Sequence, residues 1–297
     1  MIEEVLDEEP ARFDRAVTVV IPAFNEGAHV AAQLRDVLRV MEASGWAFEL
    51  ILVDDGSVDR TAQEADSVGV RVLRRRNNRG YGASLKLGIK NAKHDWILIT
   101  DADGTYPVSA IPTLLELAPA NEMVVGARTG STVRIPLARR PAKWFLGRLA
   151  SYLAGRKLPD INSGLRLMRK SLINHYVHLL PDGFSFTTTI TLAAACNGHP
   201  VEYVPIDYHA RLGESKIRAR HAYDFTLLIL RTIVFFNPLK VFIPIGAALA
   251  AIGTAKLAYD ITRDNLSETS VLSFLAALII FAVGLLADQN ARLGLRK

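Results

Sequence analysis

The sequence predicts an α/β protein: a domain with a mostly parallel sheet, then an amphipathic helix, then two transmembrane helices. Three observations predict this class. Short β-branched runs alternate with helix-spaced segments in the first hundred residues, several of these runs end in polar loops, and two long apolar runs follow residue 240. Half of the 297 residues are hydrophobic, which excludes a disordered chain, and a single cysteine excludes a disulfide framework.

Four apolar runs are expected to be strands, because each is short, rich in β-branched residues and bounded by polar turns. Between them, apolar residues recur at helical spacing, as at Val30, Leu34 and Val37. The predicted strands are residues 17–21, 50–53, 70–73 and 96–100, and the predicted helices are 27–44, 61–67 and 83–92. This alternation favours a parallel sheet with helices on both faces.

Polar loops follow three of these strands. They read Pro-Ala-Phe-Asn-Glu at 22–26, Asp-Asp-Gly-Ser at 54–57 and Asp-Ala-Asp at 101–103. In sheets of this kind, ligands bind where the carboxyl ends of the strands meet. The three loops therefore predict one binding site at that edge.

Two acidic pairs stand in these loops. Asp101 and Asp103 repel each other unless a cation or a donor lies between them, and hard divalent cations prefer oxygen ligands. This pair fits a metal site that also holds a pyrophosphate. Asp54 and Asp55 form the second pair, and the simpler alternative for them is a turn before a helix cap at Asp59.

The two C-terminal apolar runs are long enough to cross a membrane. Residues 241–259 carry one charge, Lys256, and residues 271–287 carry none, whereas a span needs roughly 17 to 25 apolar residues. Two buried core helices are the alternative. Basic residues before the first run and after the second predict that both ends of this hairpin are cytoplasmic.

These features divide the chain into four parts. We expect an acidic tail at 1–15, an α/β domain at 16–216, an amphipathic helix on the inner leaflet at 217–238, and a two-helix transmembrane region with a short tail at 239–297. Residues 1–10 are acidic and lack the apolar core of a secretory signal. We therefore expect an integral protein of the inner or plasma membrane, with its catalytic domain and both termini in the cytoplasm.

Four motifs, in order, resemble those of family 2 inverting glycosyltransferases, which have the Rossmann-like GT-A nucleotide-sugar fold. They are Ile-Pro-Ala-Phe-Asn-Glu at 21–26, Val-Asp-Asp-Gly-Ser-x-Asp-x-Thr at 53–61, Asn-x-Gly-x-Gly-Ala at 78–83 and Asp-Ala-Asp at 101–103. Gly-Ala-Arg at 126–128, Asp-x-x-Ser-Gly-x-Arg at 160–166 and Arg-x-Gly-x-Ser-Lys at 211–216 are similar to the dolichyl-phosphate mannose synthase and polyprenyl-phosphate glycosyltransferase branch.

The resemblance implies a nucleotide-sugar donor, either a UDP- or a GDP-hexose. Pro22, Ala23 and Glu26 would line the nucleoside pocket, and Asp54 would bond the base or the ribose. The other donor-binding residues that it implies are Asp55, Ser57, Gly80, Asp101, Asp103, Arg211 and Lys216.

The resemblance also implies a metal, Mg²⁺ or Mn²⁺, held by Asp101 and Asp103 on the donor pyrophosphate. In some relatives a glutamine two residues after the second aspartate reaches the metal. Thr105 occupies that position here, so we leave it out of the metal shell.

Residues 123–159 contain eight basic residues and no acidic one. A solvated surface is the simpler explanation of such a run. Arginine forks suit phosphate, however, and the stretch precedes the membrane spans, so an anionic lipid or a lipid-linked phosphate is the expected partner rather than nucleic acid.

We expect this basic stretch to help bind the lipid-linked phosphate as the sugar acceptor. The expected acceptor-binding residues are Arg128, Arg139, Arg140, Ser163 and Arg166, and those expected to carry catalysis are Asp103 and Arg128.

No general base is identifiable in the sequence. An alcohol acceptor needs one, yet residues 186–191 read Phe-Thr-Thr-Thr-Ile-Thr, without a carboxylate. A phosphate acceptor is largely ionised at pH 7 and does not. Together with the resemblance, this predicts a single inverting, metal-assisted transfer of one sugar to polyprenyl (undecaprenyl or dolichyl) phosphate.

Three alternatives stay open. The sugar could go to a lipid alcohol such as diacylglycerol, the protein could be a non-catalytic sugar-nucleotide-binding scaffold, or it could be a carrier of the lipid product. A homo-oligomer is also allowed, because small residues in the first span, among them Gly246 and Gly253, would permit close helix approach.

Overall fold

The computed structural model describes residues 14–130, 147–152, 154–183, 185–208, 227, 234–263 and 267–294. The chain divides into two compact units. The first comprises residues 1–134, 162–190 and 199–215, and the second comprises residues 135–161, 191–198 and 216–297. The expected tail at 1–15 and most of the expected amphipathic helix at 217–238 lie outside the described residues.

The first unit is built on a seven-stranded sheet in the order β3-β2-β1-β4-β6-β5-β7. Its strands are β1 (Ala16–Ala23), β2 (Ala47–Asp54), β3 (Arg71–Arg74), β4 (Trp96–Ile99), β5 (Met123–Ala127), β6 (Arg166–Arg169) and β7 (Val201–Pro205). Strand β6 is antiparallel to β4 and β5, and the other neighbouring pairs are parallel. The four predicted strands correspond to β1–β4, so the mostly parallel sheet is confirmed.

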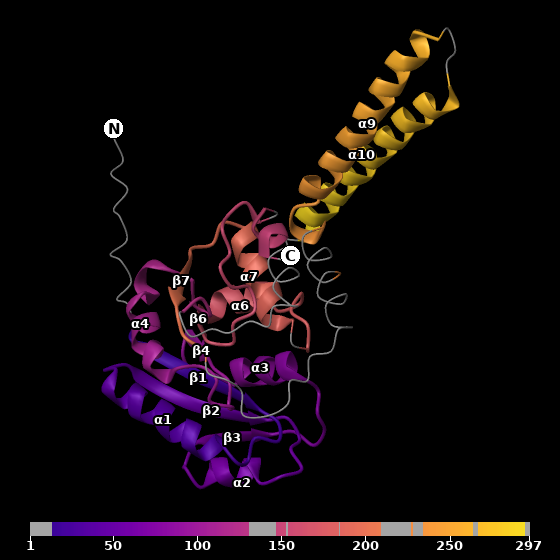
Figure 1. Ribbon diagram of the computed structural model, residues 1–297. Helices are drawn as coiled ribbons and strands as arrows, with labels where there is room; N and C mark the ends of the chain where they lie inside the picture. The colour runs from indigo at the N-terminus through magenta and orange to yellow at the C-terminus, as the bar shows by residue number, and fades with distance from the viewer. Residues whose placement is uncertain are drawn as a thin grey trace, which may run out of the picture. The chain divides into compact units, whose positions relative to one another are not determined.

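Helices connect these strands (Figure 1). They are α1 (Val30–Ala43), α2 (Thr61–Asp66), α3 (Tyr81–Lys90), α4 (Ile111–Glu116), α6 (Lys170–Tyr176) and α7 (Phe186–Cys196), with short 3₁₀ turns η1 (Val108–Ala110) and η2 (Ala118–Ala120). The prediction that the first helix begins at residue 27 was wrong by three residues. The Glu26 carbonyl accepts the amides of His29 and Val30, so residues 26–29 form a turn before α1.

Alternation along β1 places the helices on both faces of the sheet. Val17, Val19 and Ile21 pack in one core with the apolar stripe of α1, which is Val30, Leu34, Val37 and Met41. Val20 points to the opposite face, toward Gly88 of α3. A Cβ added to Gly88 would meet the Val20 side chain and would lie only 3.2 Å from Val53 Cγ2. The missing side chain at Gly88 therefore lets α3 lie close on β1 and β2.

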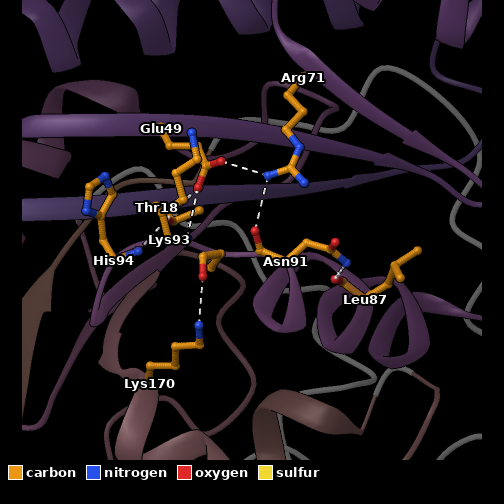
Figure 2. Close-up of polar contacts among 9 residues, drawn as sticks. Thr18, Glu49, Arg71, Leu87, Asn91, Lys93, His94 and Lys170 are labelled. Carbon is orange, nitrogen blue, oxygen red and sulfur yellow. Dashed lines mark hydrogen bonds and ion pairs between the residues drawn. The ribbon is translucent and has the colours of Figure 1, made fainter.

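The amino-terminal edge of the sheet is braced by Glu49 (Figure 2). Its Oε1 accepts from Arg71 Nη1 at 2.8 Å, and its Oε2 accepts from Thr18 Oγ1 and the Lys93 amide, each at 3.1 Å. Arg71 also donates to the Asn91 carbonyl at the end of α3. This cluster ties β1, β2 and β3 to the turn that leads into β4.

The second unit contains an antiparallel pair of long helices, α9 (Leu239–Ile261) and α10 (Glu268–Gly294), at the positions of the two predicted spans. In their most apolar windows only 11% and 17% of residues are buried. Buried core helices, the alternative explanation, would be covered on most sides, so this exposure favours two helices that could cross a membrane.

Glycines hold α9 and α10 together. A Cβ on Gly246 would lie 2.9 Å from the Phe281 ring, and one on Gly284 would lie 2.7 Å from Phe242 Cβ. Gly253 is likewise buried, against Ser273. Gly246 and Gly253 therefore serve close packing within the chain, and the homo-oligomer that the sequence allows is not supported by this contact.

Candidate active site

The carboxyl ends of the parallel strands bring the predicted loops to one edge of the sheet. Strands β1, β2, β4 and β5 end at Ala23, Asp54, Ile99 and Ala127, and the antiparallel β6 begins at the same edge with Arg166. The Asp-Ala-Asp loop thus lies between the β1 loop and the loops that flank β6. Arg128 follows β5 at this edge too.

Asp101 and Asp103 are held by different donors. Tyr81 donates its hydroxyl to Asp101 Oδ1 at 3.1 Å, and Thr105 donates its amide (3.1 Å) and its hydroxyl (2.7 Å) to Asp103 Oδ1. Both carboxylates are half-buried and flank the buried Ala102. Thr105 thus orients a predicted metal ligand.

The donor set fits a hard divalent cation. Mg²⁺ typically binds one or two protein carboxylates together with phosphate oxygens. Asp101 and Asp103, separated by one residue after β4, supply such a pair. Within the described residues no group of three or more His, Cys, Asp or Glu side chains could hold a metal alone. A metal held by Asp101 and Asp103 would share them with other oxygen ligands, such as water or phosphate.

Two tyrosines surround Asp101. Burial and the nearby Asp101 carboxylate raise the pKa of Tyr81 well above its usual value, so its hydroxyl stays protonated and donates. Burial likewise raises the pKa of Tyr106, whose hydroxyl accepts from the Gly164 amide at 2.6 Å. Both tyrosines are therefore neutral hydrogen-bonding groups at neutral pH.

Asp54 and Asp55 shape the loops at this edge. Asp54 is fully buried; its Oδ1 accepts from the Ser57 amide and its Oδ2 lies 3.2 Å from Arg74 Nε. Asp55 accepts from the amides of Arg79 and Gly80, the latter at 2.7 Å. These bonds give Asp54, Asp55 and Gly80 a structural role in the loops. Their contacts with the nucleotide-sugar donor stay predictions.

The β1 loop is fastened to the β2 loop. Asn25, at φ +56°, donates its amide to Ser57 Oγ at 2.9 Å, and its Oδ1 accepts from the Val58 amide. Asp59 accepts from the amides of Gly27 and Thr61, so it joins the β1 loop to the start of α2. Arg60 occupies the N-cap position of α2 but makes no capping bond with its side chain. Ser57 thus positions the β1 loop, beside the predicted donor residues: the buried Pro22 and Ala23 and the half-buried Glu26.

Gly80 and Gly82 let a distant loop come close. A Cβ on Gly80, at φ +103°, would lie 2.6 Å from the Asp182 carbonyl, and one on Gly82 would lie 2.9 Å from the Gly183 carbonyl. The Asp182 carbonyl accepts from the Ala83 amide. The glycine-rich turn therefore seats the loop that leads into α7.

Arg128 is clamped in place. Its Nη2 donates to Asn162 Oδ1, and its guanidinium lies 5.3 Å from the centre of the Tyr208 ring. Tyr208 packs edge-on against Tyr106 at 5.2 Å. This oriented cation follows β5, at the same sheet edge as Asp101.

Ser163 and Arg166 are buried completely. Ser163 donates its hydroxyl to the Gly126 carbonyl at 2.5 Å, and Arg166 donates to the carbonyls of Ser163 and Thr187. Side chains held this way position the loop before β6 and the start of α7. Their predicted contact with the acceptor stays a prediction.

The other predicted site residues lie outside the described part of the chain. They are Arg139, Arg140, Arg211 and Lys216.

A second basic group lies at this edge, and the sequence analysis did not single it out. Two open hollows, of about 410 and 320 Å³, share Arg75 and Arg76 and are lined further by Arg74, Arg79, Asn77, Gly56, Ser57 and Leu87. The run Arg-Arg-Arg-Asn-Asn-Arg at 74–79 was the available signal. Its position after β3, next to the Asp-Asp loop, makes it a candidate for an anionic part of the donor.

Family models match both units. The model described as glycosyl transferase family 2 matches residues 18–177, and the model of a GtrB C-terminal hairpin matches residues 237–293. A dolichyl-phosphate hexose transferase of Haloferax volcanii is 30% identical over 203 residues, which are 68% of this chain and 86% of that protein. An undecaprenyl-phosphate 4-deoxy-4-formamido-L-arabinose transferase of Edwardsiella ictaluri is 29% identical over 250 residues, covering 80% of this chain and 74% of the relative.

Solved structures agree on the fold. A glucosyl-3-phosphoglycerate synthase of Mycobacterium tuberculosis, solved with Mn²⁺, UDP and phosphoglyceric acid, superposes with a TM-score of 0.60 at 18% identity, over 74% of this chain and 78% of that one. Its fold is GT-A, as the motifs implied. With a family model matching more than half of the chain, this protein belongs to glycosyl transferase family 2 and is a glycosyltransferase.

Proposed function

We propose that the protein transfers one sugar from a nucleotide sugar to polyprenyl phosphate in a single inverting step. The observation that carries the proposal is the clamped cation Arg128 on the same sheet edge as Asp101 and Asp103. Relatives named for transfer to dolichyl or undecaprenyl phosphate support the acceptor class.

The donor binds along the ends of β1, β2 and β3. Pro22, Ala23 and Glu26 line the nucleoside pocket, while Asp55 and Ser57 hold the loops around it. The arginines at 74–76 line open hollows beside these loops, where they attract the negative charge of the nucleotide. Arg211 and Lys216 are proposed to contact the donor phosphates.

Asp101 and Asp103 are the proposed metal ligands. A Mg²⁺ or Mn²⁺ ion bound to them would offset the charge that builds on the departing nucleoside diphosphate. Thr105 keeps the Asp103 carboxylate oriented, and Tyr81 does the same for Asp101.

The acceptor phosphate is bound by Arg128, assisted by Arg139 and Arg140. Asn162 and Tyr208 hold the guanidinium of Arg128, which reduces the entropy lost on binding. The phosphate oxygen attacks the anomeric carbon as the bond from that carbon to the diphosphate oxygen breaks. Helix α7 contains no carboxylate, and an ionised phosphate needs no base, so this acceptor matches the chemistry of the site.

The hairpin α9–α10 anchors the enzyme in the membrane that holds its lipid acceptor. Lys240 lies in the first turn of α9 and Arg292 in the last turn of α10, so we propose that both ends of the hairpin, and the catalytic domain, are cytoplasmic.

The test uses purified protein in detergent with Mn²⁺ or Mg²⁺ and a panel of UDP- and GDP-sugars. Polyprenyl phosphate, polyprenol and diacylglycerol are offered as acceptors, and the extracted lipids are read by mass spectrometry. We expect a gain of one sugar on the phosphate alone, abolished by EDTA. Transfer to polyprenol or diacylglycerol would overturn the acceptor assignment, and product formed in EDTA would overturn the metal.

A further inference from the structure

Tyr81 is the first residue of α3, and its hydroxyl reaches across to the Asp-Ala-Asp loop. The bond to Asp101 Oδ1, at 3.1 Å, joins residues 20 apart in the sequence. Helix α3 itself lies close on β1 and β2, because Gly88 offers no side chain there. Tyr81 therefore projects from a fixed helix and not from a loose loop.

The start of α3 is fixed as well. Asp55 accepts the amides of the two residues before Tyr81, Arg79 and Gly80. Gly80 is in a backbone conformation, φ +103°, that a residue with a Cβ rarely adopts. On its far side it abuts the Asp182 carbonyl. Position and direction of the Tyr81 ring thus follow from the Asp-Asp loop.

Asp101 is confined on a second side by the loop before β6. A Cβ on Gly164 would lie 3.0 Å from each Asp101 carboxylate oxygen, so this backbone passes as close to the carboxylate as a glycine permits. The amide of Gly164 donates to the Tyr106 hydroxyl at 2.6 Å, which holds the loop there. The carboxylate of Asp101 lies between a tyrosine donor and a glycine backbone.

We propose that Tyr81 is a positioning residue for the metal-binding carboxylate of Asp101, and that the Asp55–Gly80 contact sets its place. The inference rests on the proposed function, which assigns the metal to Asp101 and Asp103. Tyr81 donates to Oδ1 and so fixes the rotation of the carboxylate, which leaves the group ready for a divalent cation before that cation binds. It does not touch the reacting atoms.

The test is Tyr81→Phe in the full-length protein, with Mn²⁺ as the probe. Free Mn²⁺ is followed by electron paramagnetic resonance during a titration, with and without UDP or GDP. Loss of one hydrogen bond to a charged group should raise the Kd of Mn²⁺ about 10-fold. The rate at saturating Mn²⁺ and the KM for polyprenyl phosphate should change less than the Kd, because Tyr81 acts only through Asp101.

Two further variants make the result decisive. Tyr176→Phe removes a hydroxyl that bonds His199 at 2.9 Å, far along the chain from the Asp-Ala-Asp loop, and should leave Mn²⁺ affinity unchanged. Asp101→Asn should abolish the high-affinity binding. If Tyr81→Phe has the same thermal midpoint as Tyr176→Phe and keeps the wild-type Kd for Mn²⁺, the inference is overturned while the proposed function stands. If Asp101→Asn also keeps that Kd, the metal assignment of the proposed function fails too.

Discussion

At the amino-terminal edge of the sheet, Glu49 is surrounded by donors from three segments and its side chain is 10% exposed (Figure 2). At the carboxyl-terminal edge, Asp101 and Asp103 are half-buried on a loop, and each has its orientation set by a neighbouring hydroxyl. Both edges therefore carry carboxylate side chains, a glutamate at one and two aspartates at the other. The difference lies in where the donors come from. Glu49 accepts at both carboxylate oxygens from three segments that it ties together, whereas Tyr81 and Thr105 orient Asp101 and Asp103 through Oδ1.

Asp54 and Asp55 show that position alone does not decide the role. They lie at the carboxyl-terminal edge, yet both are buried and bonded to backbone amides, much as Glu49 is bonded at the other edge. A carboxylate that accepts from the backbone amides of a neighbouring loop holds loops together. A half-buried one whose rotation is fixed is prepared for a cation or a substrate.

We expect the largest effect from Asp103→Asn, which removes one charge from the half-buried pair. Oδ1 can still accept from Thr105 after this change, so the loop should keep its shape while one charge is lost. We expect sugar transfer to fall by at least about 100-fold. The measurement is product formation by mass spectrometry, and Asp66→Asn, at an exposed helix end, is the control. Near-normal transfer by Asp103→Asn would rule out its proposed metal role.

Arg128→Ala tests the acceptor half of the same edge. A lost charge-assisted contact should raise the KM for polyprenyl phosphate about 10- to 100-fold and leave the donor KM nearly unchanged. The KM of Arg128→Lys for polyprenyl phosphate should lie between those of the wild type and Arg128→Ala, because lysine keeps the charge but lacks the forked guanidinium. Arg39→Ala, at an exposed surface pair, should change neither KM. If the donor KM rises instead, Arg128 belongs to the donor.

The sequence predicts one side of this comparison better than the other. Strands β1–β4 were predictable because each is a short apolar run that ends in a polar turn. Strand β6 was not, because Arg166-Leu-Met-Arg169 carries arginine at both ends. Bonds such as those of Arg166 to the carbonyls of Ser163 and Thr187 make its burial tolerable. The interaction of Thr105 with Asp103 is local and readable from spacing, whereas that of Tyr81 with Asp101 depends on how α3 packs.

Glu49→Gln should show the structural side of the comparison. It weakens a cluster with three donors, so we expect a loss of about 1 to 2 kcal/mol in stability with both KM values unchanged. The thermal midpoint is the measurement, and Glu42→Gln, exposed at the end of α1, is the control. A large loss of activity without a loss of stability would contradict the assignment.

The same cluster predicts a pH dependence. Partial burial alone would raise the pKa of Glu49, but hydrogen bonds from the Lys93 amide, Arg71 and Thr18 outweigh it and hold the pKa below 4.5. The folded state therefore binds fewer protons, so the stabilisation is complete above pH 4.5 and is lost as the pH falls through the folded pKa. The thermal midpoints of the wild type and Glu49→Gln should converge over that acidic range. A gap that stays constant would show that charge is not the cause.

The smallest effect is expected for Lys86→Met. Lys86 Nζ lies 2.8 Å from Asp182 Oδ1, but the Asp182 side chain is 65% exposed, and such pairs contribute less than about 1 kcal/mol. The loop at 181–183 should stay in place, because the Ala83 amide still donates to the Asp182 carbonyl. Gly82→Ala is the opposite control: its Cβ would meet backbone that has no room to give, so it should lower the thermal midpoint far more. Were Lys86→Met the more damaging change, the exposed ion pair and not the close backbone contact would be holding this loop.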